Sequence, residues 1–217
     1  MKEELQLTKE TRRRDRIFLA AESLFALHGY NGVSIRDISK SADVNSALVQ
    51  YYFGTKESLY RSIFEQRYRS VTDERLSRIE LISPDKDKRA WTHALVQVWV
   101  APSLLLTKKR GGARFIRLLA REYYDPESEQ RGIIKEYFDP SARVFIGKLR
   151  QVFPQASNSD IAYAYQSMIT LLLTLGVSAR QAIRLSEGDA AKNLEQRVAY
   201  IVDFVAAGVF ESLSRSS

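Results

Sequence analysis

The chain has 217 residues, of which 45% are hydrophobic and 27% charged, a composition typical of one soluble globular protein. It contains no cysteine and only two histidines, which excludes disulfide and thiolate chemistry and disfavours a histidine-based metal or catalytic centre. The formal net charge of +7, from 33 basic and 26 acidic residues, suggests a polyanionic partner.

Apolar residues recur at helical spacing along almost the whole chain, and no segment shows sustained strand-like alternation. The predicted fold is therefore all-α, with a compact N-terminal module (residues 11–71) joined without a linker to a larger helical body (72–217). Thr8 is expected to cap the first helix, and Ser83, followed by Pro84, the fifth. The predicted helices cover residues 9–28, 35–41, 46–53, 56–82, 84–105, 112–124, 127–138, 141–152, 159–186 and 190–214.

Two of these helices, 35–41 and 46–53 (motif 34–53), are short and separated by a tight turn at Asp43-Val44. This arrangement is that of a helix-turn-helix, whose second helix enters the major groove of DNA. Small and polar residues at the front of that helix suit base edges, and hydroxyl, amide and cationic groups around it suit phosphates. The predicted DNA contacts are Arg14, Ser34, Arg36, Asn45, Ser46, Ala47, Gln50, Tyr51, Tyr52 and Lys56.

Several of these residues also allow a purely structural interpretation. Ser34 is equally suited to cap the helix that follows it, and the basic run around Arg14 to lie in solvent. Of the two adjacent tyrosines, we expect Tyr51 to reach phosphate and Tyr52 to lie in the core. Residues 1–70 carry 12 basic and nine acidic side chains, a net charge of +3, so affinity for DNA must depend on placed contacts.

The segment RIFLAAESLFALHGYNGVSIRDISKSADVNSALVQYYFGTKESLY resembles the DNA-binding domain of the tetracycline-repressor (TetR) family. Its matching landmarks include Gly29-Tyr30, Ser34-Ile35-Arg36 and Lys56-Glu57, at uninterrupted spacing. Asp43 stands where the family usually has glycine, and because aspartate tolerates the left-handed backbone conformation we expect the turn to be kept. Gln50 stands where tyrosine is common, and it is a candidate reader of adenine.

The last two predicted helices have wider apolar faces than one core needs, which indicates a partner surface. In the resembled family this pair forms a four-helix dimer interface, which would set two recognition helices about one DNA turn apart on a near-palindromic operator. The alternative is one thick monomer core. The predicted interface residues are Ile169, Leu173, Gly176, Leu194, Val198, Ile201, Val205 and Val209.

The middle helices are rich in aromatic residues, and the resemblance implies that some line a cavity for a small, mostly apolar effector. A neighbouring stripe of Arg114, Arg117 and Arg121 is either a clamp for an acidic effector or a solvated face, and we favour the solvated face. The predicted lining residues are Trp91, Trp99, Phe115, Leu118, Leu119, Glu122, Phe138, Phe145, Met168 and Leu172.

The resemblance implies a homodimeric regulator, a repressor released from operator DNA when the effector binds. Two alternatives remain open: an effector-less, structural DNA-binding protein, and an all-α enzyme using carboxylates such as Glu122, Asp125 and Asp139. No catalytic residue, metal or cofactor is expected, because no Ser/His/Asp set, metal cluster or glycine-rich phosphate loop occurs. Without an apolar signal segment or a bilayer-length apolar run, we expect a cytoplasmic protein with no membrane partner.

Overall fold

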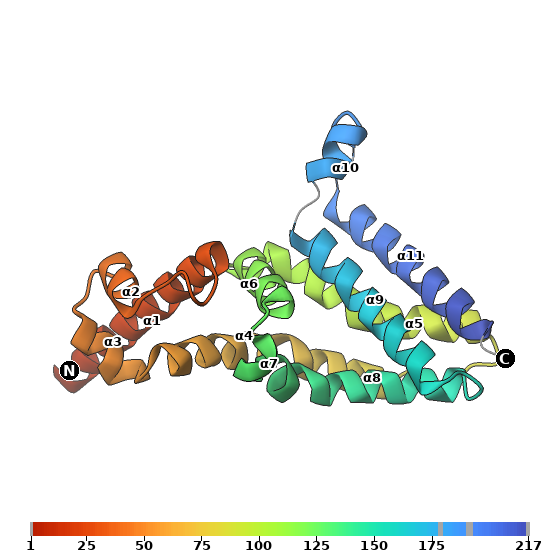
Figure 1. Ribbon diagram of the computed structural model, residues 1–217, viewed down its shortest axis with the longest axis horizontal. Coiled ribbons are helices and arrows are strands. Elements are labelled where there is room, and N and C mark those ends of the chain that lie inside the picture. The colour runs from red at the N-terminus through yellow and green to blue at the C-terminus, as the bar shows by residue number, and fades with distance from the viewer. Residues whose placement is uncertain (1, 178–179, 190–192, 216–217) are drawn as a thin grey trace.

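A computed structural model describes residues 2–177, 180–189 and 193–215, and every regular element in these ranges is a helix. The first three helices gather at one end of an elongated molecule, and α4 runs from them into the body (Figure 1). The helices are α1 (Lys2–His28), α2 (Ile35–Ser41), α3 (Ser46–Phe53), α4 (Lys56–Glu80), α5 (Lys88–Leu105), η1 (Leu106–Lys108), α6 (Gly112–Tyr124), α7 (Ser128–Arg131), the π-helical turn η2 (Ile134–Phe138), α8 (Asp139–Val152), α9 (Asn158–Val177), α10 (Arg180–Leu185) and α11 (Leu194–Ser214).

Three predicted helices, 35–41, 46–53 and 112–124, match the structure at both ends. Two predicted caps are wrong. Thr8 lies inside α1, which begins at Lys2, and α5 begins at Lys88 because Asp87, not Ser83, caps it by accepting hydrogen bonds from the amides of Arg89 and Ala90.

The segments predicted as 127–138 and 159–186 are both divided. The first becomes α7 and η2, because Gly132 between them adopts a left-handed conformation with φ of +65° and ends α7. The second becomes α9 and α10, and residues 178–179 between them lie outside the described ranges.

The turn between α2 and α3 has the conformation expected of it. Asp43 has a φ of +52°, so aspartate does occupy the left-handed region here, as predicted. The amide of Val44 donates to the carbonyl of Ser39 at 3.0 Å, and the Arg16 guanidinium donates to the Asp43 carbonyl at 3.2 Å. These bonds hold the two short helices at a fixed angle.

The N-terminal module and the body are packed together through α4 and α6. α4 passes without a break through the predicted boundary between residues 71 and 72. Phe115 and Ile133 from the body are buried in the same apolar cluster as Phe25 and Phe64 from the module. Displacements in the body can therefore reach the module through packed side chains as well as along α4.

The body is built around α5, which packs against α4, α8, α9 and α11. α9 is the one described helix long and apolar enough, by length and composition, to cross a membrane, and here one side of it packs in the core of the body. The predicted dimer-interface stripes face that same core. Six of these residues are under 9% exposed within the single chain, which corrects their assignment to an intermolecular surface: Ile169, Leu173, Val198, Ile201, Val205 and Val209.

The other two predicted interface residues also face inward. A Cβ atom added at Gly176 would lie 3.0 Å from the Ile116 side chain, so α6 approaches α9 closely here. Leu194 is half-buried against the core of the body. The side chains predicted for the interface are therefore buried or half-buried within the single chain.

Candidate nucleic-acid interface and buried pocket

The helix-turn-helix, made of α2 and α3, is at one end of the molecule (Figure 1). Val49 and Phe53 are buried in the core of the module and fix one side of α3. Its opposite side is open to solvent. Four predicted contacts are exposed there: Ser46, Ala47, Gln50 and Tyr51.

Three of the predicted contacts also stabilise the motif itself. The Ser34 hydroxyl accepts from the Asp37 amide at 3.2 Å, and the Ser34 amide donates to the Asp37 carboxylate at 2.9 Å, which completes a capping box. Asn45 caps α3 by accepting from the Leu48 amide at 2.7 Å. The Ser46 hydroxyl lies 3.0 Å from that of Ser39. The side chains of Ala47, Gln50 and Tyr51 lie on the open side of α3, where they do not cap either helix of the motif.

The two adjacent tyrosines divide as expected between surface and core. Tyr51 is 78% exposed, whereas Tyr52 is half-buried against the core of the module. The Tyr52 ring meets Tyr51 edge-on at 5.2 Å between centroids, which limits where the outer ring can point. Arg14 and Arg36 are exposed on α1 and α2, and the Arg14 guanidinium lies 5.2 Å from the Phe53 ring centre.

Lys56, a predicted phosphate contact, has a structural role that the sequence did not indicate. Its ammonium donates to the carbonyls of Tyr30 and Val33, each at 3.1 Å, and lies 4.1 Å from the Tyr30 ring centre. Partial burial, together with nearby Arg131, holds the pKa of Lys56 below its usual value. Lys56 thus ties the start of α4 to the segment between α1 and α2.

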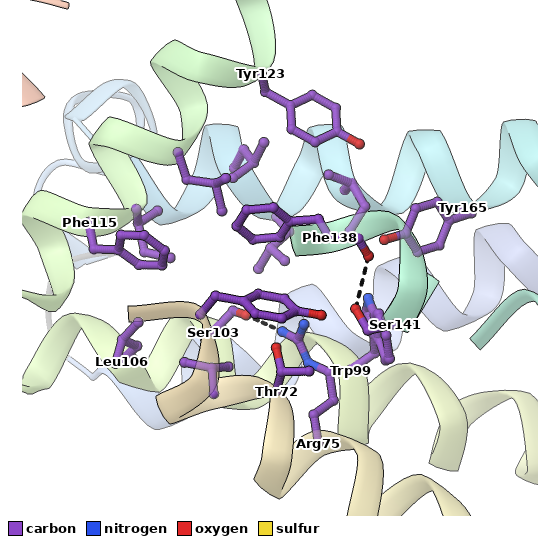
Figure 2. Close-up of a pocket in the computed structure, with 17 residues that line it drawn as sticks. Thr72, Arg75, Trp99, Ser103, Leu106, Phe115, Tyr123, Phe138, Ser141 and Tyr165 are labelled. Atoms are coloured by element: carbon purple, nitrogen blue, oxygen red, sulfur yellow. Dashed lines mark hydrogen bonds between the residues drawn. The ribbon is translucent and has the colours of Figure 1, made fainter. Parts of the chain in front are cut away.

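A cavity of about 50 Å³ lies in the body among α4, α5, α6, η2, α8 and α9 (Figure 2). Its walls are mainly aromatic and aliphatic, and by general measures its volume holds only a few water molecules. Side chains must therefore move before an organic molecule enters. Five of the ten predicted lining residues line it: Trp99, Phe115, Leu119, Phe138 and Leu172.

The other five predicted residues lie elsewhere. Phe145 packs behind the wall against Trp99, with ring centroids 4.8 Å apart. Met168 lines a separate surface groove between α9 and α11. Trp91 and Leu118 are buried core residues, and Glu122 belongs to a buried charged cluster. Helical spacing identified apolar faces here but could not show which of them enclose a cavity.

Sequence reasoning missed two polar residues of the pocket wall, Thr72 and Arg75, which are both on α4. Arg75 is only 7% exposed, and its Nη2 donates to the Ser103 hydroxyl (Figure 2). Its guanidinium lies 4.5 Å from the Trp99 ring centre, and among the residues that the structure describes its Nε has no hydrogen-bond partner. The buried Thr72 hydroxyl, one turn earlier, also has none. Burial lowers the pKa of Arg75 to about 10.

The buried charged cluster joins the module to the body beside α6. Glu122 is 1% exposed and accepts hydrogen bonds from the Tyr60 hydroxyl at 2.9 Å, the Arg131 Nη2 at 2.9 Å and the Ser128 hydroxyl at 3.2 Å. Burial disfavours the charged form of Arg131, but the carboxylates of Glu122 and Asp125 outweigh it and raise the pKa of Arg131. Glu122 is therefore fully engaged within the protein.

The basic stripe on α6 binds the first helix. Arg121 donates to the carbonyls of Ala26 and Leu27 at 3.0 and 2.7 Å, near the C-terminal end of α1, where cations are favoured. Arg114 lies 3.4 Å from the buried Glu22 carboxylate. Neither residue is on the pocket wall, and neither is simply solvated. Arg114 and Arg121 are thus part of the contact between module and body.

The outer face of α9 and α11 carries exposed aromatic side chains. Tyr163 is 73% exposed, Tyr200 69% and Phe204 57%. The rings of Tyr200 and Phe204 are stacked with centroids 6.3 Å apart. Between the two helices a surface groove of about 290 Å³ is lined by Tyr163, Phe204 and Gly208, among others. This face, and not the predicted stripes, is the apolar surface that the two helices present to solvent.

Two family models match the chain, one for each region. Residues 17–63 match the model described as bacterial regulatory proteins, tetR family. Residues 97–208, just over half of the chain, match the tetracyclin repressor-like C-terminal domain. The first match contains the helix-turn-helix, and the second contains most of the body.

Relatives and solved structures agree with these matches. The transcriptional repressor NicS of Pseudomonas putida is 38% identical over 36% of this chain and 37% of its own length. The regulatory protein RaaS of Mycobacterium tuberculosis is 30% identical over 59% of this chain and 62% of its own. This chain therefore spans less than two thirds of either relative. A structure of AibR with isovaleryl coenzyme A and operator DNA has the same fold, with 20% identity, a TM-score of 0.61, and coverage of 88% of this chain and 97% of that one.

Proposed function

The chain belongs to the tetracycline-repressor family of bacterial regulators, and we propose that it is a homodimeric repressor released from a near-palindromic operator by a small organic effector. The observation that carries this proposal is the exposed side of α3. Ala47, Gln50 and Tyr51 are open to solvent there, on a helix whose caps and buried side hold it in place. Such a helix suits the major groove, with Gln50 placed to read a base and Tyr51 to bind phosphate.

Dimerisation is proposed through the outer face of α9 and α11. Three exposed aromatic residues and a groove lie together on this face, and contiguous exposed apolar surface of this kind often marks a protein–protein interface. Pairing two such faces about a two-fold axis would make a self-complementary interface, and it would present two copies of α3 to successive grooves on one side of the DNA.

The proposed effector site is the buried pocket, because its wall includes α4, the helix that begins directly after α3. An effector that binds only when the pocket is expanded would favour an altered position of α4 and hence of α3. It would release DNA to the extent that it binds the released state more tightly than the DNA-bound one. AibR, which has the same fold, was solved with an acyl thioester and operator DNA together.

The alternatives are less well supported. An effector-less protein would not require a cavity with unpartnered polar groups. Of the carboxylates considered for an enzyme, Glu122 and Asp125 are both paired with Arg131, so neither is available for proton transfer. We therefore propose a regulator of transcription and not an enzyme. The family match is the reason that we also propose a cytoplasmic location.

The test is binding to the DNA upstream of the protein's own gene, measured by fluorescence anisotropy over a range of salt concentrations. A dimer that neutralises about six to ten phosphates should lose affinity linearly on a log–log plot, with a slope of roughly −5 to −9. A footprint with two-fold symmetry is expected. Absence of sequence-preferring binding, or affinity independent of salt, would refute the proposal.

A further inference from the structure

The pocket contains a buried cation without a counter-ion. Arg75 is more than nine-tenths buried, and within the part of the chain that the structure describes it forms no ion pair with a carboxylate. Ser103 and the Trp99 ring satisfy it only in part, and Nε is left without an acceptor. Proteins seldom bury an unpaired charge, because desolvation is compensated only by an opposite charge and hydrogen bonds. A missing anionic partner is therefore indicated.

The groups around Arg75 fit one particular anion. Thr72, one helical turn before it on α4, adds a hydroxyl that also has no hydrogen-bond partner in the described part of the chain. Among the lining residues, all of which the structure describes, Arg75 is the only charged one. One guanidinium and its neighbouring hydroxyls balance a single negative charge, and the planar guanidinium matches a carboxylate by two parallel hydrogen bonds. The aromatic and aliphatic walls beyond suit an apolar body.

We propose that the effector is an organic monocarboxylic acid and that Arg75, assisted by Thr72, binds its carboxylate while the aromatic wall holds its apolar part. This inference rests on the proposed function, whose effector it assigns to a chemical class. Because Arg75 and Thr72 are both on α4, the carboxylate would act directly on the helix that leads to α3. The anionic anchor is thus also the point at which the ligand would shift the DNA-binding module.

The experiment is isothermal titration of three acids and their neutral amides: butyrate, octanoate and phenylacetate against butyramide, octanamide and phenylacetamide. Octyl phosphate tests a doubly charged head group. The variants are Arg75→Met, which removes the charge at similar volume, Arg75→Lys and Thr72→Val. Arg69→Met is the matched control, because Arg69 is on the same helix but is exposed and paired with Glu65.

At least one acid should bind the wild-type protein at least tenfold more tightly than its amide does. Arg75→Met should lose that tenfold preference, Arg75→Lys and Thr72→Val should keep part of it, and Arg69→Met all of it. Arg75→Met should be as stable as the wild type or more so without ligand, because an unpaired buried charge is replaced by an apolar side chain. If Arg75→Met does not fold, Arg75→Lys and Thr72→Val still test the inference, because each should reduce the preference for the acid over its amide.

The inference is overturned if the amides bind as well as the acids, if octyl phosphate is preferred, if Arg75→Met retains the preference, or if no acid binds. Each of these results leaves the proposed function standing as long as the wild-type protein binds its upstream DNA. None of the substitutions should impair DNA binding in the absence of ligand. Failure to bind DNA would instead count against the proposed function, whatever the ligand data show.

Discussion

The buried hydroxyl of Tyr60 donates a 2.9 Å hydrogen bond to Glu122, and this bond joins the first turns of α4 to the last turn of α6. Both helices also line the pocket, α4 through Arg75 and α6 through Phe115. The module is thus connected to the pocket along α4 itself and through α6. A ligand that separates α4 from α6 would strain the Tyr60–Glu122 bond, which lies nearer to α3 than the pocket does.

Tyr60→Phe should lower the free energy of unfolding by about 1.5–3 kcal/mol, the usual contribution of a hydrogen bond to a charged group. Burial and the neighbouring Glu122 both raise the pKa of Tyr60, so the hydroxyl stays protonated and able to donate throughout the neutral range. Urea unfolding followed by circular dichroism measures the change. Tyr124→Phe, on the exposed side of α6, is the control and should be neutral. Equal losses for both variants would contradict the assigned bond.

Gly111 lies beside the ion pair between buried Glu22 and Arg67. It has a φ of +83°, and a Cβ there would lie 2.4 Å from the Arg67 guanidinium. Gly111→Ala should therefore push Arg67 away from Glu22. Gly132→Ala meets the same kind of backbone strain, with φ of +65° and no neighbour within 4 Å.

Gly111→Ala should lower the free energy of unfolding by about 2 kcal/mol more than Gly132→Ala does, because the buried Glu22 carboxylate loses part of its ion pairing. Thermal and urea unfolding of the two variants side by side give the difference. If the two losses were the same, the ion pair would contribute nothing beyond what the backbone strain explains.

Local signals accounted for the helix-turn-helix. Ser34 and Asn45 define the starts of α2 and α3 through their own hydrogen bonds, and Gly54 ends α3 with a φ of +71°. Asp43 takes the left-handed conformation that was expected of it. These features depend on residues within a few positions of one another, so the sequence contains nearly all the information that decides them.

Long-range packing decided the features that were not predicted. Periodicity marked stripes on α9 and α11 but could not show that α5 covers them, which leaves Tyr163, Tyr200 and Phe204 outside. A signal for Arg75 was present, because it follows Tyr68 and Val71 at helical spacing on the inner side of α4. Recognising it required knowing that this side of α4 is buried at residue 75.

Tyr51→Ala should weaken operator binding without affecting stability. The side chain is 78% exposed and contributes little to the fold beyond its contact with Tyr52. Loss of one hydrogen bond of about 1 kcal/mol in each of two protomers corresponds to a roughly thirtyfold loss of affinity. Fluorescence anisotropy at fixed salt measures it, and Tyr124→Ala serves as an exposed tyrosine outside the module. Wild-type affinity in Tyr51→Ala would remove this residue from the interface.

Phe204→Ser should convert the protein to a monomer if the exposed face of α9 and α11 is the dimer interface. In a two-fold interface the substitution occurs twice, and two losses of about 2 kcal/mol each would weaken association by about a thousandfold. Sedimentation velocity at micromolar concentration separates the two states. Leu81→Ser, which removes an 81% exposed apolar side chain just after α4, should leave the dimer intact. A wild-type monomer, or a Phe204→Ser dimer as stable as the wild type, would place the interface elsewhere.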